Sequence, residues 1–575
     1  MTRVRLLILV LACAVVSTTL SAGSATLRAK KGIVISVNEI ASKVGADVLR
    51  DGGSAGDAIV ATAFALAVVH PSAGNIGGGG FITYRTAGGD AAAYDFREVA
   101  PGKSSPTMFL KDGKYDSSIH HAGPISVGVP GTVAGLHMVW KEQGKLTWKR
   151  LIDPAIALAR DGFPLSDSLA RSLANAMKSM APYPTSVAQF SKAGVPYQMG
   201  EILKQPDLAK TFEKIAAQGP AGFYEGDVAL AIEKEMQKQG GLITREDLKN
   251  YKAVRRVPVK GTYRGYEVIS MPPPTSGGVA IIEMLNVLEG YDLAKMGFGS
   301  AQSMHLMIES MRRAYADRAH YMGDSDFVKD MPLTKLMSKE YAAELRKTIS
   351  LTKASKSSPA SFEWGPESDE TTHVSVVDGD KNAASMTYTL EGGFGSKIVV
   401  TGGGFLLNNE MGDFNANPGV TTPEGLIGTP PNVAMPGKRM LSSMSPTILA
   451  KDGKLFMVTG SPGGRTIINT VLETILDVVD FGMNAQEAVD AGRIHHQWLP
   501  ERTSYERYAF SPDTIAELER RGHTLQAAGG QGTAEVIVYN VKDDMLEGGN
   551  DRRSADGAAV GVNTVNPVSP QMKRQ

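Results

Sequence analysis

The sequence has almost no cysteine: Cys13 is the only one in 575 residues. It lies inside an apolar N-terminal segment, so a chain that loses this segment has no thiol. That absence excludes disulfides, cysteine nucleophiles and cysteine-ligated metals together. The preceding residues, Val10-Leu11-Ala12, loosely resemble a lipoprotein cleavage site. Lipidation of Cys13 is therefore a second, less favoured interpretation of the segment.

The N-terminal apolar run is too short to cross a membrane. It extends from Leu6 to Val16, which is 11 residues, whereas a spanning helix needs roughly 20. Arg3 and Arg5 precede the run and small residues follow it over 21–25, which is the layout of a secretory signal. We therefore predict a signal peptide over 1–25, a periplasmic or secreted location, and no stable membrane span after its removal.

The chain has no excess of either charge. It contains 60 basic and 60 acidic residues, and beyond the N-terminal region the basic residues gather only in short pairs such as Arg255-Arg256. No electrostatic footprint for nucleic acid is visible, so a small or neutral partner is favoured. Hydrophobic residues make up 42% and charged residues 21%, which is typical of a soluble globular protein.

The sequence also lacks a zinc motif, a P-loop and an EF-hand. His120-His121 and His495-His496 are adjacent pairs, whose side chains diverge and cannot easily share a metal as an i, i+4 helical pair does. The glycine-rich stretch 52–56 matches the G-x-S-x-G pattern of a hydrolase nucleophile elbow, but a helix is expected before it instead of the required strand. We predict no metal and no cofactor.

Hydrophobic periodicity divides the chain into two parts. Helical patterns predominate up to about residue 345, and alternating strands predominate after residue 371, which together imply a layered α/β fold. Between them, from Ser350 to Asp369, a polar stretch without apolar periodicity predicts an exposed, mobile connector. The expected helices are Asn38–Arg50, Asp57–Val69, Ala155–Ala159, Leu208–Ala217, Ala229–Gln239, Gly278–Leu288, Ser303–Tyr321 and Thr466–Val479. The expected strands are Phe81–Arg85, Ala91–Phe96, His373–Val377, Ala383–Leu390, Thr447–Leu449 and Leu455–Thr459.

Two details of the helices are expected from their patterns. Asp57 is suited to cap the helix that it begins, and this helix is apolar nearly all round, which indicates a buried core helix. The helices of the middle region, from about 146 to 345, are expected to be amphipathic with their polar faces outward.

The run from Thr371 to Asp378 closely resembles the start of the small subunit of γ-glutamyltranspeptidases, which are N-terminal-nucleophile hydrolases. Further motifs agree in the same order, and the resemblance covers nearly the whole mature chain. They are Asp95-Phe96-Arg97-Glu98 with Ala100-Pro101, Pro272 to Gly278, Leu407 to Met411, Leu441 to Thr447 and Gly460 to Gly464. The resemblance implies cleavage between Glu370 and Thr371 into a large subunit, 26–370, and a small subunit, 371–575. It also implies an αββα sandwich formed jointly by both subunits, which stay together as one heterodimer.

The chemistry of such a family requires an N-terminal threonine. A threonine hydroxyl is a poor nucleophile at neutral pH unless a base takes its proton, and a free α-amine on the same residue can do so. The resemblance implies that Thr371 first attacks the peptide bond after Glu370. It then attacks the γ-carbonyl of a small γ-glutamyl substrate, giving an ester that is released to water or an acceptor amine. Glutathione is the expected substrate of the family.

The resemblance also assigns roles to the site residues. Thr389 is expected to bond the new amino terminus, and the backbone of Gly463 and Gly464, before a predicted helix, to form an oxyanion hole. A simple helix-start turn explains these glycines equally well when they are considered alone. The expected substrate-binding residues are Arg97, Ser442 and Ser443 for the α-carboxylate, Asp413, Glu410 and Glu391 for the α-ammonium, and Asn409 for orienting nearby groups.

The sequence departs from the family pattern at three places. Gly412 stands where the family often has an acid, and Glu391 stands where many relatives have asparagine. The segment 415–438 has the length of a lid loop but lacks the aromatic residue often found there. Two rival interpretations stay open: a self-cleaving acylase acting on glutaryl or cephalosporin-type amides, which needs no ammonium pocket, and an inactive periplasmic homologue that only binds.

Overall fold

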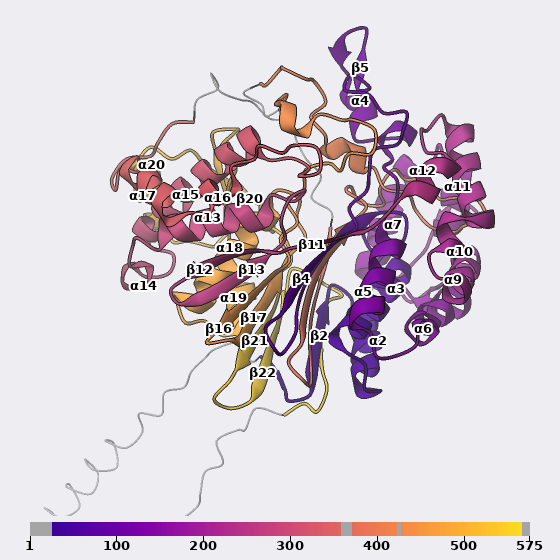
Figure 1. The fold of residues 1–575 in the computed structure, drawn as a ribbon, viewed down its shortest axis with the longest axis horizontal. Helices are drawn as coiled ribbons and strands as arrows, with labels where there is room; N and C mark the ends of the chain where they lie inside the picture. The colour runs from indigo at the N-terminus through magenta and orange to yellow at the C-terminus, as the bar shows by residue number, and fades with distance from the viewer. Residues whose placement is uncertain (1–25, 358–370, 423–426, 566–575) are drawn as a thin grey trace, which may run out of the picture.

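The computed structural model describes residues 26–357, 371–422 and 427–565. Its centre is a pair of stacked seven-stranded antiparallel sheets (Figure 1). Sheet A has the order β1-β22-β21-β17-β16-β13-β12, and sheet B has the order β11-β4-β3-β15-β14-β2-β23. The strands of sheet A are β1 Leu27–Ala29, β12 Val259–Tyr263, β13 Tyr266–Ser270, β16 Thr447–Lys451, β17 Lys454–Gly460, β21 Glu535–Asn540 and β22 Met545–Asn550. Those of sheet B are β2 Gly32–Ser36, β3 Gly79–Arg85, β4 Ala91–Asp95, β11 Val254–Arg256, β14 Thr372–Asp378, β15 Ala383–Thr389 and β23 Ala558–Gly561.

Helices cover the outer face of each sheet, one group on each side in Figure 1. Over sheet B lie α2 Glu39–Arg50, α3 Ala55–Val69, α5 Thr132–Gln143, α6 Trp148–Asp161, α7 Asp167–Met180, α9 Pro206–Gln218 and α11 Gly226–Gln239. Over sheet A lie α13 Gly277–Leu288, α15 Ala301–Tyr321, α17 Lys339–Lys347, α18 Thr466–Val479, α19 Ala485–Asp490 and α20 Pro512–Arg520. The predicted αββα sandwich is thus the observed fold.

The side chains of each strand point alternately to the two faces of the sheet and so fill the cores on both sides of it. In β2, Ile33 and Ile35 point between the sheets and contact Ile448 and Leu546 of sheet A, whereas Val34 points outward against the helices. Because successive side chains of a strand face opposite sides, one apolar strand serves two cores at once. Both faces of sheet B are therefore buried.

The two sides of the predicted cleavage point share sheet B. Strand β14 pairs with β15 on one side and with β2 on the other, and β15 pairs with β3. The strands that follow Thr371 therefore lie between strands from the first part of the chain. The fold is built jointly, as predicted.

Two expectations about the helices were wrong. The cap of α3 is Ser54, whose hydroxyl accepts from the Asp57 backbone N–H, while the Asp57 side chain accepts from the Ser54 N–H. This reciprocal capping box places Asp57 in the first turn of the helix and not before it. Helix α13 does not present a polar face to solvent, because all of its residues are buried beneath α15 and α17.

Part of the predicted connector is described. Ser355 donates its backbone N–H to Glu309 of α15 at 3.0 Å, and Ser350 accepts a hydrogen bond from His305 at 2.7 Å. Residues up to 357 are thus attached to α15. The predicted signal peptide with Cys13, the rest of the connector and Glu370 lie outside the described residues.

In the part of the chain that the structure describes, every helix is too short or too polar to traverse a bilayer.

Candidate active site

Thr371 lies immediately before β14, deep between the helices and sheets. In the antiparallel ladder Thr372 pairs with Tyr388, so Thr371 lies opposite Thr389 at the end of β15. Thr371 is 8% exposed and Thr389 is 3% exposed. Both line a small hollow, here called the inner pocket. Its other lining residues are Arg97, Glu391, Glu410, Asp413, Ser442, Ser443, Met444, Gly464 and Ile467.

The inner pocket gathers most of the residues that the sequence predicted for the site. Asn409 does not line it but lies behind Glu391, and Gly463 faces a larger hollow on the other side of Thr371. The structure brings these residues together from strands, loops and a helix start that are distant in the sequence. Their roles remain predictions.

Arg97 is fixed in the wall of the inner pocket by several bonds. It follows β4 and is fully buried. Its guanidinium donates to Glu410 and to Asp413 through its two terminal nitrogens, and its Nε donates to the carbonyl of Met440 at 3.4 Å. The Tyr251 hydroxyl donates to the Arg97 carbonyl at 2.9 Å. The two acids come from one short turn, Glu410–Asp413, so this turn and the arginine position each other.

Arg97 and the acidic side chains around it differ in how readily they carry a charge. Burial raises the pKa of Glu98 to about 8, although Arg97 opposes the shift, and burial also raises the pKa of Glu410 well above its usual range. Burial opposes the charge on Arg97, but Glu410, Asp413 and Glu98 outweigh it and raise the pKa of the guanidinium. Arg97 therefore stays charged, while two of its neighbouring carboxyls hold protons readily.

Glu391 is held at the junction of three groups. Its backbone has a φ of 76°, an uncommon conformation for a residue with a side chain. Its N–H donates to the Thr389 hydroxyl at 2.9 Å, its Oε1 is bonded to His121 Nδ1 at 2.6 Å, and Asn409 donates its amide N–H to the other oxygen. The Asn409 Oδ1 accepts from the Gly392 N–H at 2.9 Å. This network orients the Glu391 carboxylate beside Thr371.

The serine pair is supported from α15 and from the Pro272–Gly278 motif. The carbonyl of Ser442 accepts from the Ser276 N–H at 2.9 Å and from the Ser276 hydroxyl at 2.8 Å. Arg318 donates to the Ser443 hydroxyl at 3.0 Å and to the Ser276 hydroxyl at 2.7 Å. The buried Arg318 therefore braces both segments.

Sequence reasoning assigned no role to His121, Arg318 or Glu98. Glu98 belongs to a quoted motif, so its position was visible even though its burial was not. His121 was treated only as half of a histidine pair, and no sequence signal distinguishes Arg318 from the other basic residues of α15.

Gly463 and Gly464 form a tight turn directly before α18. Their φ angles are 128° and 54°, which favour glycine. A Cβ on Gly463 would lie 2.5 Å from Thr466 Oγ1 and 3.0 Å from Gly532 Cα. The turn therefore requires glycine on both conformational and steric grounds. It places backbone groups beside Thr371 at the start of a helix, where the helix dipole is positive.

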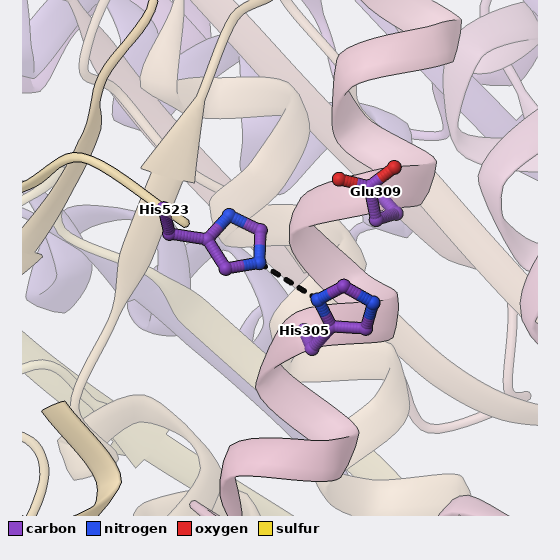
Figure 2. A group of neighbouring side chains, drawn as sticks. All are labelled: His305, Glu309 and His523. Carbon is purple, nitrogen blue, oxygen red and sulfur yellow. Dashed lines mark hydrogen bonds between the residues drawn. The ribbon is translucent and has the colours of Figure 1, made fainter. Parts of the chain in front are cut away.

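One group of metal-ligating side chains occurs within the described ranges: His305, Glu309 and His523. Figure 2 shows His305 and Glu309 on α15, with His523 reaching them from a separate loop. His305 Nε2 must donate to the Ser350 carbonyl at 2.7 Å, since a carbonyl only accepts. For the neutral ring, His305 Nδ1 then accepts from His523 Nε2 at 2.7 Å.

The side chains of this group already have hydrogen-bond partners within the protein. Glu309 accepts from Arg313 at 2.8 Å and from the Ser355 N–H at 3.0 Å. Burial lowers the pKa of His523 to about 4, with the neighbouring His305 adding to the effect. Arg313 supplies the positive charge that a metal cation would bring to Glu309. We therefore assign this group as a structural link between α15, the connector and the loop after α20.

The chain is similar to known proteins over nearly all of its length. A family model described as Gamma-glutamyltranspeptidase matches residues 41–561. A glutathione hydrolase proenzyme of Escherichia coli strain K12 is 48% identical over 539 residues, which cover 93% of this chain and 92% of that protein.

Solved structures agree with the fold. A cephalosporin acylase from Bacillus halodurans has a TM-score of 0.84 at 28% identity, covering 95% of this chain and 98% of that one. The γ-glutamyltranspeptidase of Helicobacter pylori has a TM-score of 0.54 at 48% identity, covering 55% of this chain and 91% of that one. With the family model and a relative both spanning the chain, it belongs to the γ-glutamyltranspeptidase family.

Proposed function

We propose that this chain is a self-processing enzyme that hydrolyses γ-glutamyl amides and transfers the γ-glutamyl group to amines. The observation that carries the proposal is the position of Thr371 at the start of β14, lining one pocket with both Arg97 and Asp413. A nucleophile that becomes N-terminal on cleavage thus faces one cationic and one anionic group. A γ-glutamyl substrate presents the complementary pair, an α-carboxylate and an α-ammonium.

Processing is the first step of the proposed reaction sequence. The Thr371 hydroxyl attacks the carbonyl carbon of Glu370, and the peptide C–N bond gives way to an ester. Water then cleaves the ester, which frees the Thr371 hydroxyl and leaves a free α-amine on the same residue. In the mature site this amine can take the hydroxyl proton at close range.

The catalytic cycle repeats the same chemistry on a substrate. The Thr371 oxygen attacks the γ-carbonyl, the amide C–N bond breaks, and the leaving nitrogen departs with a proton passed through the α-amine. Water or an acceptor amine then attacks the ester carbonyl, and Thr371 recovers its proton. The turn at Gly463 and Gly464 stabilises the oxyanion of each step through backbone N–H groups at a helix start.

Recognition of the glutamyl group follows from the charges of the inner pocket. Arg97 binds the α-carboxylate with help from Ser442 and Ser443, because a guanidinium offers a planar fork of donors. Asp413 binds the α-ammonium with Glu410 and Glu391. Arg97 is already fixed by Glu410 and Asp413, so it needs little reorganisation to receive the substrate.

The subunit organisation and location belong to the same proposal. The signal peptide over 1–25 directs export, and cleavage before Thr371 gives subunits 26–370 and 371–575 in one heterodimer. Its partners are the γ-glutamyl substrate and the acceptor, glutathione being the family substrate.

A self-cleaving acylase is the second candidate, because the Bacillus halodurans structure of this fold is a cephalosporin acylase. An acylase for glutaryl groups would need the arginine but no partner for an ammonium. The acidic side chains Glu391 and Asp413, which line the inner pocket together with Glu410, favour the γ-glutamyl substrate.

The experiment that tests the proposal is a denaturing gel of the purified protein, N-terminal sequencing of its smaller chain, and assays with γ-glutamyl and glutaryl p-nitroanilides. We expect two chains, with the smaller beginning Thr371-Thr372-His373, and faster turnover of the γ-glutamyl anilide. Thr371→Ala should give one uncut chain. A single band for the unmodified protein would support the inactive binding homologue, and a preference for the glutaryl anilide would support the acylase.

A further inference from the structure

Gly412 lies in the short turn Glu410–Asp413, and one neighbouring ring explains why it has no side chain. Its backbone has no positive φ, so its conformation alone does not require glycine. A Cβ at this position would lie 2.4 Å from His121 Nδ1 and 2.9 Å from Glu391 Oε1. The ring of His121 therefore fills the space that a side chain at position 412 would need, and the glycine lets this ring lie against Glu391.

His121 and Asn409 hold the two oxygens of Glu391 from two different segments. His121 Nδ1 lies 2.6 Å from Oε1, and the Asn409 amide donates to Oε2. An ionised carboxylate only accepts hydrogen bonds, so His121 Nδ1 is the donor in this contact. The Asn409 amide also donates to the His121 carbonyl at 3.0 Å, which links the three residues in a closed ring of contacts. A carboxylate has sites for about four hydrogen bonds, so these two contacts orient Glu391 without filling it.

The segment that carries His121 is anchored by the preceding residue. His121 directly follows the short helix α4 Ser117–His120. His120 Nε2 donates to the Phe414 carbonyl at 3.0 Å, and His120 Nδ1 accepts from the Tyr115 hydroxyl at 3.0 Å. Burial lowers the pKa of His120 to about 3, which agrees with a neutral ring that donates through one nitrogen and accepts through the other. His120 thus attaches this segment to the end of the turn, and the His121 ring is directed at Glu391 from a fixed backbone.

We propose that His121 is a positioning residue for the donor substrate: it holds the Glu391 carboxylate toward the α-ammonium of the γ-glutamyl group, and Gly412 provides the room for it. Glu391 lines the inner pocket with Thr371, whereas His121 acts on the substrate only through Glu391. Without His121 the carboxylate can rotate, and fixing it when the substrate binds then costs side-chain entropy. This inference rests on the proposed function and adds a residue that determines its substrate preference.

The test measures kcat and KM for the γ-glutamyl and glutaryl p-nitroanilides with the processed enzyme. A glutaryl group has no ammonium, so it reports everything except the proposed contact. His121→Ala removes the donor, His121→Asn offers an amide N–H near the position of Nδ1, and Gly412→Ala introduces a methyl group that displaces the ring. The side chain of His121 is 28% exposed, so its removal opens no sealed cavity. His320→Ala is the matched control, because it removes an exposed histidine of α15 that lines neither hollow beside Thr371.

We expect His121→Ala to lower the preference for the γ-glutamyl anilide roughly three- to tenfold, the range of one hydrogen bond. The loss should come from a higher KM for this substrate at a nearly unchanged kcat, since the contact binds the substrate before and during reaction alike. His121→Asn should keep most of the preference, and His320→Ala should keep all of it. Gly412→Ala should resemble His121→Ala, and the double variant should fall no further, because both changes break the same contact.

Four outcomes would overturn the inference. They are an unchanged preference in His121→Ala, an equal loss for both anilides, a loss in His121→Asn as large as in His121→Ala, and additive losses in the double variant. An equal loss for both anilides would show that His121 only supports the fold. None of these outcomes touches the proposed function, which wild-type hydrolysis of the γ-glutamyl anilide reports separately. Absence of that hydrolysis would reject the proposed function, and this inference with it.

Discussion

At the scale of single residues, we propose that Arg97 and Asp413 divide the recognition of the substrate. Replacing either residue by alanine removes one partner of a desolvated charged contact with the substrate. Such a loss costs about 2 to 5 kcal/mol, or roughly 30- to 4,000-fold in kcat/KM. Asp413→Ala should lose much of the preference for γ-glutamyl over glutaryl anilide, because only the first has an ammonium. Arg97→Ala should weaken both substrates, because both have the carboxylate.

The measurement is kcat/KM for the two anilides with each processed variant. Self-cleavage uses the chain's own peptide bond and needs no zwitterion, so both variants should still process if they fold, and Arg97→Lys serves as the milder replacement. If Asp413→Ala kept the full preference for the amine-bearing substrate, the ammonium would have to bind elsewhere, with Glu391 or Glu410 next to be tested.

Glu98 should make the stability of the protein depend on pH. Its pKa is 4.5 in the reference state and about 8 in the folded protein, so between these values the folded state binds more protons than the unfolded state. Stability from this group is complete below pH 4.5 and is lost as the pH rises through about 8. Glu98→Gln keeps the shape without the charge and should flatten this decline.

The measurement is Tm as a function of pH for wild type and Glu98→Gln across that window. Glu410 titrates in the same direction, so some decline should persist in the variant. An unchanged slope after the substitution would show that Glu98 is already charged in the folded protein.

At the scale of elements, the turn before α18 is the part of the site most sensitive to a single methyl group. Gly463→Ala would combine a φ of 128° with a contact of 2.5 Å to Thr466 Oγ1, so the turn must shift. If its N–H groups bind the oxyanion, kcat should fall by roughly 100-fold or more, with a smaller effect on KM.

Gly453→Ala is the matched control. Gly453 lies between β16 and β17, with a φ of 74° and open space around its Cβ position. It carries a similar conformational cost without touching the site. Equal losses of kcat in the two variants would mean that Gly463 matters only for stability.

The elements also show what sequence reasoning could and could not predict. The strong periodic segments, such as α18 and β14, were placed within a residue or two, because their patterns are local. Strand β2 was not predicted, since both of its pairing partners are hundreds of residues away. Strands β12 and β22 were also missed, although each forms a hairpin with a strand that is close in the sequence. The capping of α3 by Ser54 and the burial of α13 likewise depend on neighbours that periodicity does not reveal.

For the candidate site, too, only part of the arrangement could be predicted from the sequence. The residues of the inner pocket were named from a family resemblance and not from spacing, because Arg97 and Asp413 are 316 positions apart. The support from Arg318 and His121 was not predicted, since each acts through a contact that only the folded chain creates.

At the scale of the whole molecule, the interleaving of strands in sheet B leads us to expect that the two proposed subunits cannot separate without unfolding. Strands β14 and β15 lie between β2 and β3, so cleavage leaves their ladders intact. Processed protein should elute as one species in native size-exclusion chromatography and separate into two chains only under denaturing conditions. Recovery of a folded large subunit alone under native conditions would contradict this.

Under the proposed processing, the position of Thr371 immediately before a central strand also sets the timing of cleavage. The strand is held by neighbours from its own chain on both sides, so the hydroxyl is delivered to its target bond by folding and not by encounter with another molecule. Cleavage should then follow first-order kinetics, with the same half-life in a dilute sample as in a concentrated one. Mixing mature enzyme with the uncut Thr371→Ala chain should leave that chain uncut, however long the two are kept together.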